Sequence, residues 1–256
     1  MSPGYVKSQT RSGITTIEFY HPQSNSLPRV LLEELAREFH SAGNEDETRV
    51  IVLRSAGDKA FCAGASFEEL ASIKNHAEGL EFFSGFAHVI NAMRKCPQFI
   101  IARVQGKCVG GGVGLAAAAD YVIAMEDAEI RLSELALGIG PFVVGPAVER
   151  KIGFSAFTQL AMDATLWRNA DWARRRGFYA ETHNTFEALD ESINRLATNL
   201  SHYSPQAMAE MKKVFWKGTE DWDKLLIERA AISGKLIVSE FSKNAIENFK
   251  MKKARQ

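Results

Sequence analysis

Apolar residues recur along the first half of the chain with two alternating periods. Short runs that are apolar or alternate with polar residues predict strands at 13–20, 49–55, 98–104 and 121–125. Apolar residues at helical spacing predict helices at 31–42, 67–74 and 77–95. The runs at 49–55 and 98–104 are nearly all apolar, which is typical of parallel strands buried on both faces. The alternation predicts an α/β fold with parallel strands and crossover helices.

The pattern changes after about residue 185, where helical spacing continues to the end of the chain. Only the Ser204-Pro205 pair, Gly218 and Gly234 interrupt it, and each is expected to mark a break between helices. We therefore expect an α/β core with the functional site at 1–185, followed by a helical C-terminal region at 186–256.

The charge balance and the cysteines exclude several classes of function. Lys and Arg together number 31, as do Asp and Glu, so no net field attracts nucleic acid or an anionic membrane. No apolar run approaches the roughly 20 residues that a membrane helix needs. The three cysteines lack metal-ligand spacing and, being odd in number, do not suggest a disulfide framework. A small-molecule partner and a cytoplasmic location are the expectations.

One stretch, GKCVGGGVGLAAAAD at 106–120, has five glycines in its first nine residues and continues as a helix of small residues. The first amides of a helix have no intrahelical acceptor and lie at the positive end of its dipole. They can therefore bind a phosphate or a developing oxyanion. Two alternatives are a dinucleotide fingerprint, since GVGLAA at 112–117 fits G-x-G-x-x-A, and simple close packing of a helix on a sheet.

A second turn of the same kind favours the oxyanion interpretation. DKAFCAGASFEEL at 58–70 directly follows the strand at 49–55 and opens a helix. Two such turns at the carboxyl ends of neighbouring strands can supply the two backbone donors of an oxyanion hole.

These residues resemble the crotonase superfamily, also called the enoyl-CoA hydratase/isomerase family. The resemblance spans nearly the whole chain and follows a fixed order of segments: NSLP at 25–28, DKAFCAGASFEEL, VQGKCVGGGVGLAAAAD at 104–120, IRLSELALGIGP at 130–141 and a tail ending AIENFKMKKAR. It implies a spiral core of ββα repeats with parallel sheets. It also implies an acyl-CoA thioester substrate, no cofactor apart from the coenzyme A of that substrate, and a homotrimer or hexamer.

The resemblance assigns a role to particular residues. The backbone amides of Ala65 and Gly111 would hold the thioester oxygen, and Glu134 would be the general acid and base. Further positions would contact the substrate or its coenzyme A portion: Ser26, Lys59, Ala63, Phe67, Gly110, Phe142, Phe249 and Lys250.

The chain departs from the family's hydratases at one of two catalytic positions. The family's hydratases resemble one another in carrying a glutamate at each of two catalytic positions. In this chain the first of these positions is Gly114 and the second is Glu134. Hydration and double-bond isomerisation of an enoyl-CoA are equally favoured alternatives. Lyase and decarboxylase activities rank behind them. An alternative outside the enzymes is a catalytically weak protein that binds CoA esters. A dinucleotide-dependent oxidoreductase is a further alternative, which NAD binding would support.

The loop after Glu134 is bulkier than its counterpart in relatives. GIGPFVVG at 138–145 places Phe142 and two valines where relatives often have glycines against the substrate. We expect this loop to narrow the acyl pocket or to keep water out of it.

Overall fold

A six-stranded sheet forms the centre of the computed structural model, which describes residues 4–254. Its strands, in spatial order, are β1 (Tyr5–Arg11), β2 (Ile14–Tyr20), β3 (Val50–Ser55), β4 (Phe99–Val104), β6 (Tyr121–Met125) and β8 (Glu181–His183). The β1–β2 pair is antiparallel and every other pair is parallel. A separate two-stranded parallel sheet consists of β5 (Cys108–Val109) and β7 (Ile130–Arg131).

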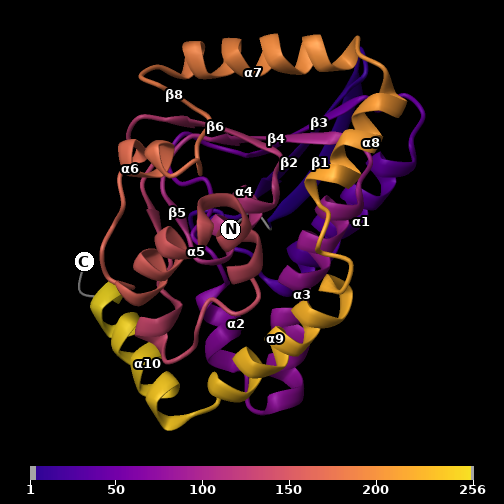
Figure 1. Ribbon diagram of the computed structural model, residues 1–256. Helices are drawn as coiled ribbons and strands as arrows, with labels where there is room; N and C mark the ends of the chain where they lie inside the picture. Colours follow the sequence, from indigo (N-terminus) through magenta and orange to yellow (C-terminus); the bar gives the residue numbers. More distant parts are fainter. Residues whose placement is uncertain (1–3, 255–256) are drawn as a thin grey trace.

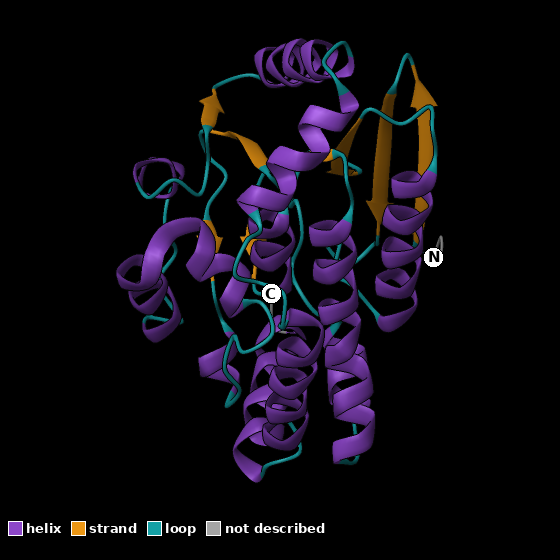
Figure 2. Cartoon of the chain, turned by 45° about the vertical axis from the view of Figure 1, so that its right-hand side comes forward, coloured by secondary structure: helices purple, strands orange, loops and turns teal. Residues whose placement is uncertain are grey.

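Helices lie on both sides of the main sheet (Figures 1 and 2). Those of the first part are α1 (Arg29–Asn44), α2 (Phe67–Ser72), α3 (His76–Lys95), α4 (Gly111–Ala118), the 3-10 helix η1 (Glu134–Leu137), α5 (Gly145–Met162) and α6 (Ala170–Arg175). Those that follow are α7 (Phe186–Ser201), α8 (Pro205–Phe215), α9 (Trp222–Leu236) and α10 (Glu240–Ala254). Within residues 4–254, no helix combines the length and apolar character needed to cross a membrane.

The predicted α/β class with parallel strands and a helical C-terminal region is confirmed. The central strands β3 and β4 are almost entirely buried, as their apolar runs indicate. The sequence pattern missed the edge strand β1, because its residues are mostly polar and half-exposed or exposed. Helix α7 packs back across the sheet, so the division at 185/186 marks a change of secondary structure; separate domains there stay a prediction (Figure 1).

The expected helix break at Gly234 is wrong, because this glycine lies inside α9. A side chain there is excluded by the neighbouring helix: a Cβ on Gly234 would lie 2.5 Å from the backbone nitrogen of Leu80. Gly79 of α3 is equally constrained, since its Cβ would lie 2.7 Å from the Cα of Gly234. The two glycines let α3 and α9 approach backbone to backbone, and this packing offsets the low helix propensity of glycine.

Candidate active site

The two glycine-containing turns predicted from the sequence lie in contact with each other. Gly64, in the turn after β3, has φ +85°, a conformation that favours glycine. A Cβ at Gly64 would lie 2.9 Å from the Val109 carbonyl oxygen and 3.4 Å from the Gly111 nitrogen. The isolated bridge between Cys62 and Cys108 also joins the two turns.

The Ala65 and Gly111 amides are both available to a ligand. The Leu27 N–H donates to the Gly64 carbonyl at 2.8 Å, and the Leu27 carbonyl accepts from Ser66 at 3.1 Å. Because alternate residues of an extended segment point to opposite sides, the Ala65 N–H points away from Leu27. Gly111 is the first residue of α4, where amides have no intrahelical acceptor. Within the described chain, neither amide donates to another protein group.

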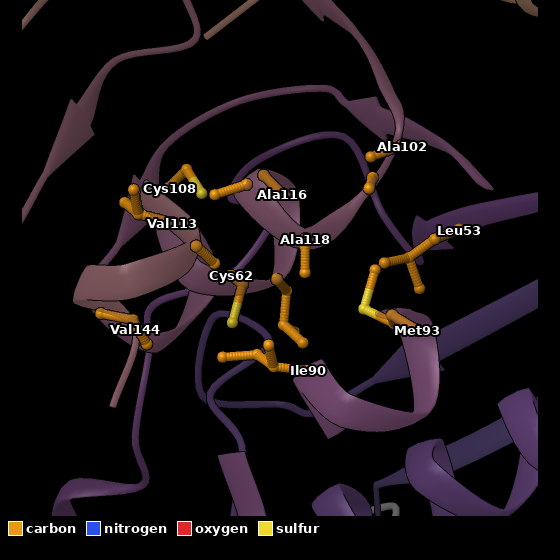
Figure 3. Packing of buried hydrophobic residues seen from close by; sticks show 14 of the residues in the cluster. Leu53, Cys62, Ile90, Met93, Ala102, Cys108, Val113, Ala116, Ala118 and Val144 are labelled. Carbon is orange, nitrogen blue, oxygen red and sulfur yellow. The ribbon is translucent and has the colours of Figure 1, made fainter. Parts of the chain in front are cut away.

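The glycines of α4 also permit close packing. A Cβ on Gly111 would lie 2.1 Å from the Phe86 ring, and one on Gly112 would lie 2.6 Å from the Cβ of Cys62. Figure 3 shows the buried cluster around this helix, which includes Cys62, Cys108, Val113, Ala116, Ala118 and Val144. The packing interpretation and the oxyanion interpretation of the glycines are therefore compatible.

Two neighbouring spaces, here called the inner cavity and the outer groove, share part of their lining. The inner cavity, about 50 Å³ in volume, is mostly apolar, and its lining includes Ala65, Gly111, Glu134, Phe142 and Val144. The outer groove has a volume of about 670 Å³ and also touches Ala65. Ala65 therefore lines both spaces.

Glu134 supplies the carboxylate of the inner cavity. It is the first residue of η1, and its Oε1 lies 3.1 Å from where a Gly110 Cβ would be. The residue as a whole is half-buried, but its Oε2 is shielded from solvent and has no hydrogen-bond partner among the described residues. Burial raises the pKa of Glu134 to about 7, against the opposing effects of nearby backbone N–H groups and the Arg131 charge. A carboxylate with such a pKa can take up and release a proton near neutral pH.

Val144 fills the space next to Gly114. A Cβ on Gly114 would lie 2.3 Å from Cγ1 and 2.6 Å from Cβ of Val144. The Val144 side chain thus occupies the space that a side chain at position 114 would need. Glu134 is the only carboxylate among the described residues that line the inner cavity.

The structure brings most of the predicted contact residues to one of the two spaces. Those that line the inner cavity are Ala63, Phe67, Gly110 and Phe142, of which Ala63 and Phe67 also line the outer groove. Ser26 and Phe249 line the outer groove, and the Phe249 ring stacks on that of Phe67 at 4.2 Å between centroids.

Two predicted lysines lie outside the linings of these two spaces. Lys59 is exposed on the turn after β3, and Lys250 is exposed on α10 beside Phe249. Neither lines the inner cavity or the outer groove. Their contact with a CoA ester stays a prediction.

The sequence interpretation missed Arg131, and it did not connect Val144 with Gly114. Arg131 lines the outer groove but belongs to a two-residue strand, too short for a periodic signal. The bulk of the loop at 142–144 is apparent from the sequence, but nothing in the sequence pairs position 144 with position 114.

Other chemistry finds little support in the described part of the chain. No group of three or more His, Cys, Asp and Glu side chains in residues 4–254 could hold a metal ion. Burial raises the pKa of Cys62, beside the site, to about 12, so this thiol stays protonated and is a poor nucleophile.

Comparison with known proteins places this chain in a family. The family model described as enoyl-CoA hydratase/isomerase matches residues 9–254. A probable enoyl-CoA hydratase of Rhizobium meliloti is 30% identical over 213 residues, 82% of this chain and 79% of the relative. A (7aS)-7a-methyl-1,5-dioxo-2,3,5,6,7,7a-hexahydro-1H-indene-carboxyl-CoA hydrolase of Rhodococcus jostii is 32% identical over 135 residues, which is 53% of this chain and about half (52%) of that relative.

A solved structure shares the fold of this chain. The crystal structure of an enoyl-CoA hydratase from Bacillus halodurans superposes with a TM-score of 0.87, at 23% identity, and the match covers 95% of this chain and 99% of that one. This likeness confirms the predicted crotonase fold. Together with the family model, which covers nearly the whole chain, it supports one conclusion: the chain belongs to the enoyl-CoA hydratase/isomerase family.

Proposed function

We propose that this protein is an enoyl-CoA isomerase that moves a double bond from C3 to C2 of an acyl-CoA by a proton transfer through Glu134. The observation that carries the proposal is the pairing of Gly114 with Val144. A second carboxylate is absent from the described lining of the inner cavity. Val144 occupies the space that a side chain at position 114 would need. One base that shuttles one proton needs no second carboxylate.

In the proposed reaction, the thioester oxygen accepts hydrogen bonds from the Ala65 and Gly111 amides. The Glu134 carboxylate removes a proton from C2 of a 3-enoyl-CoA, and the resulting dienolate places its charge on that oxygen. The double bond then moves to C2–C3 as C4 takes the same proton back from Glu134, which regenerates the carboxylate. Loss of one oxyanion donor typically costs about 3–4 kcal/mol of transition-state stabilisation.

The surroundings of Glu134 favour proton transfer over hydration. Addition of water to a 2-enoyl-CoA requires a water molecule that is held and deprotonated beside the substrate. The inner cavity has a volume of only about 50 Å³, and Phe142, Val143 and Val144 form part of its wall. These three side chains offer no hydrogen bond to hold a water beside the acyl group, and Glu134 is the single acid in the described lining. No cofactor beyond the coenzyme A of the substrate is required for the proposed step.

We propose that the outer groove holds the arm of coenzyme A. The stacked rings of Phe67 and Phe249 offer an apolar surface at its wall, and Ser26 adds a hydroxyl. Lys59 and Lys250 would then act from outside the groove, as cations near the phosphates.

Product analysis tests the proposed activity. The protein is incubated with a 3-enoyl-CoA and, separately, with the 2-enoyl-CoA of the same length, and products are separated by chromatography and weighed by mass spectrometry. We expect a 2-enoyl product of unchanged mass from the first ester, and loss of this turnover in Glu134→Gln. A gain of one water from the 2-enoyl ester, abolished in Glu134→Gln, would indicate a hydratase instead. Binding of esters without turnover would indicate a CoA-ester binding protein.

A further inference from the structure

The outer groove contains a cation without a partner among the described residues. Arg131, the last residue of β7, lines the groove beside Ser133 and Val109. Its guanidinium carbon lies 4.3 Å from the centroid of the Trp167 ring. In residues 4–254 it makes no side-chain hydrogen bond and no ion pair within 4.0 Å, and its Nε is shielded from solvent.

The stacking of Arg131 leaves its hydrogen-bond donors free. A guanidinium on an aromatic ring uses its flat face, whereas its five N–H groups point outward in its plane. Burial lowers the pKa of Arg131, and the charge of Glu134 partly opposes this shift. The two side chains form no salt bridge, so Glu134 does not occupy these donors. A shielded donor that no protein group satisfies at the wall of a groove points to a ligand.

The position of Arg131 identifies which part of an acyl-CoA it can reach. Arg131 pairs with Val109 in the small sheet, and its carbonyl accepts a hydrogen bond from the Gly110 N–H at 2.9 Å. It is therefore held beside Gly110 and Gly111, at the thioester end of the groove. The phosphates of coenzyme A are separated from the thioester by the whole pantetheine arm, and the part of that arm next to the thioester carries no charge. An anionic group within reach of Arg131 therefore belongs to the acyl portion.

The volumes of the two spaces agree with this placement. The inner cavity, about 50 Å³, is apolar apart from Glu134, Ser133 and Ser233, and a second anion there would face the Glu134 carboxylate. The outer groove is much larger, at about 670 Å³, and has Arg131 and Thr165 in its lining. A charged substituent of the acyl group therefore fits at the Arg131 end of the outer groove, which is large enough to hold it beside the arm of coenzyme A.

We propose that Arg131 recognises a carboxylate on the acyl group, so that the preferred substrates are CoA esters of dicarboxylic acids. This inference rests on the proposed function of the site as an acyl-CoA site. The planar guanidinium can bind a carboxylate through two parallel hydrogen bonds, which an ammonium cannot reproduce. Trp167 holds the guanidinium in place before the ester binds.

Lys107 provides a matched control. Its Nζ lies 4.7 Å from the centroid of the same Trp167 ring, but it forms an ion pair with Glu129 at 3.5 Å and lines neither the inner cavity nor the outer groove. Lys107→Met therefore removes a positive charge and a cation–π contact from the same tryptophan without changing the groove.

The test is equilibrium binding of saturated esters, which the proposed reaction does not consume. Calorimetry compares succinyl-CoA with butyryl-CoA, glutaryl-CoA with pentanoyl-CoA, and free coenzyme A, for the wild type, Arg131→Met, Arg131→Lys and Lys107→Met. We expect the wild type to bind at least one dicarboxylic ester about tenfold or more tightly than its neutral counterpart. Arg131→Met should abolish the preference, Arg131→Lys should keep part of it, and Lys107→Met should keep all of it.

Three results would overturn the inference. Equal wild-type affinity for charged and neutral esters would remove the role of Arg131 while leaving the acyl-CoA site intact. A uniform loss of affinity for all esters and free coenzyme A in Arg131→Met would show that the guanidinium acts on coenzyme A itself. Absence of binding to every CoA ester in the wild type would refute the proposed function and, with it, this inference.

Discussion

Replacement of Glu134 by glutamine should stabilise the protein at pH 8 but not at pH 5. Burial raises the pKa of this carboxyl to about 7, against an ordinary value of 4.5. The native state therefore holds the proton more tightly than the unfolded state does. Between pH 4.5 and about pH 7 the native state binds more protons than the unfolded state. In this range the Glu134 carboxyl therefore makes the free energy of unfolding fall as the pH rises. Above about pH 7 the loss is complete, because the carboxylate is ionised in both states.

The size of the effect follows from the two pKa values. They differ by about 2.5, and each pH unit corresponds to 1.36 kcal/mol, which gives about 3 kcal/mol in the free energy of unfolding. This figure is an upper limit, since Glu134 as a whole is half-buried and solvent screens part of its charge. Glutamine has nearly the same shape and no charge, so it avoids the loss at high pH.

Urea denaturation at a series of pH values between 5 and 8.5 measures the difference. The variants are Glu134→Gln and, as control, Glu126→Gln, which removes an exposed carboxyl on the turn after β6. Protein concentration is held constant, because any self-association would contribute to the apparent stability. The stability of Glu134→Gln relative to wild type should increase with pH, and that of Glu126→Gln should not. A relative stability of Glu134→Gln that is constant or falls with pH would refute the buried, high-pKa carboxyl.

Three further predictions follow from the site. In the isomerisation assay, kcat/KM should rise with pH and level off above about pH 7, because the ionised Glu134 is the base; a flat profile between pH 5.5 and 8.5 would contradict this role. Gly114→Glu should cost about 1–3 kcal/mol of stability through overpacking against Val144, and Val144→Gly should remove most of that cost; an equal cost in both backgrounds would show that the two positions do not compete for space. Phe249→Ala should weaken binding of CoA esters several-fold, in line with about 0.5–1.5 kcal/mol for a lost aromatic contact, with little change in kcat; unchanged affinity would remove Phe249 from the groove's function.

The apolar pattern was sufficient to predict the central strands and the glycine-rich helix. Strands β3 and β4 are buried on both faces, so burial alone dictates their composition, and β6 lies at the predicted 121–125. Strand β1 carries no such signal, because its residues are mostly exposed or half-exposed. The short strands β5 and β7 are defined by pairing between distant segments, which a local pattern does not encode.

The candidate site could be predicted where a role belongs to a local segment. Gly111 at the start of a helix is recognisable from the sequence around it, and Glu134 came from the resemblance. The contact of Gly114 with Val144 joins positions thirty residues apart, and so it emerges only from the folded chain. Gly234 shows the same limit in reverse: locally it indicates a helix break, yet its packing against α3 keeps it helical.

Transfer of a deuterium label tests the central claim most directly. A 3-enoyl-CoA that carries deuterium at C2 is converted in ordinary water, and the position of deuterium in the 2-enoyl product is read by NMR and mass spectrometry. If Glu134 alone moves the proton in this mostly apolar cavity, a measurable fraction of product should carry deuterium at C4, and Glu134→Gln should form no product. Product that never carries deuterium at C4, or unchanged turnover in Glu134→Gln, would contradict a single shielded glutamate as the proton carrier.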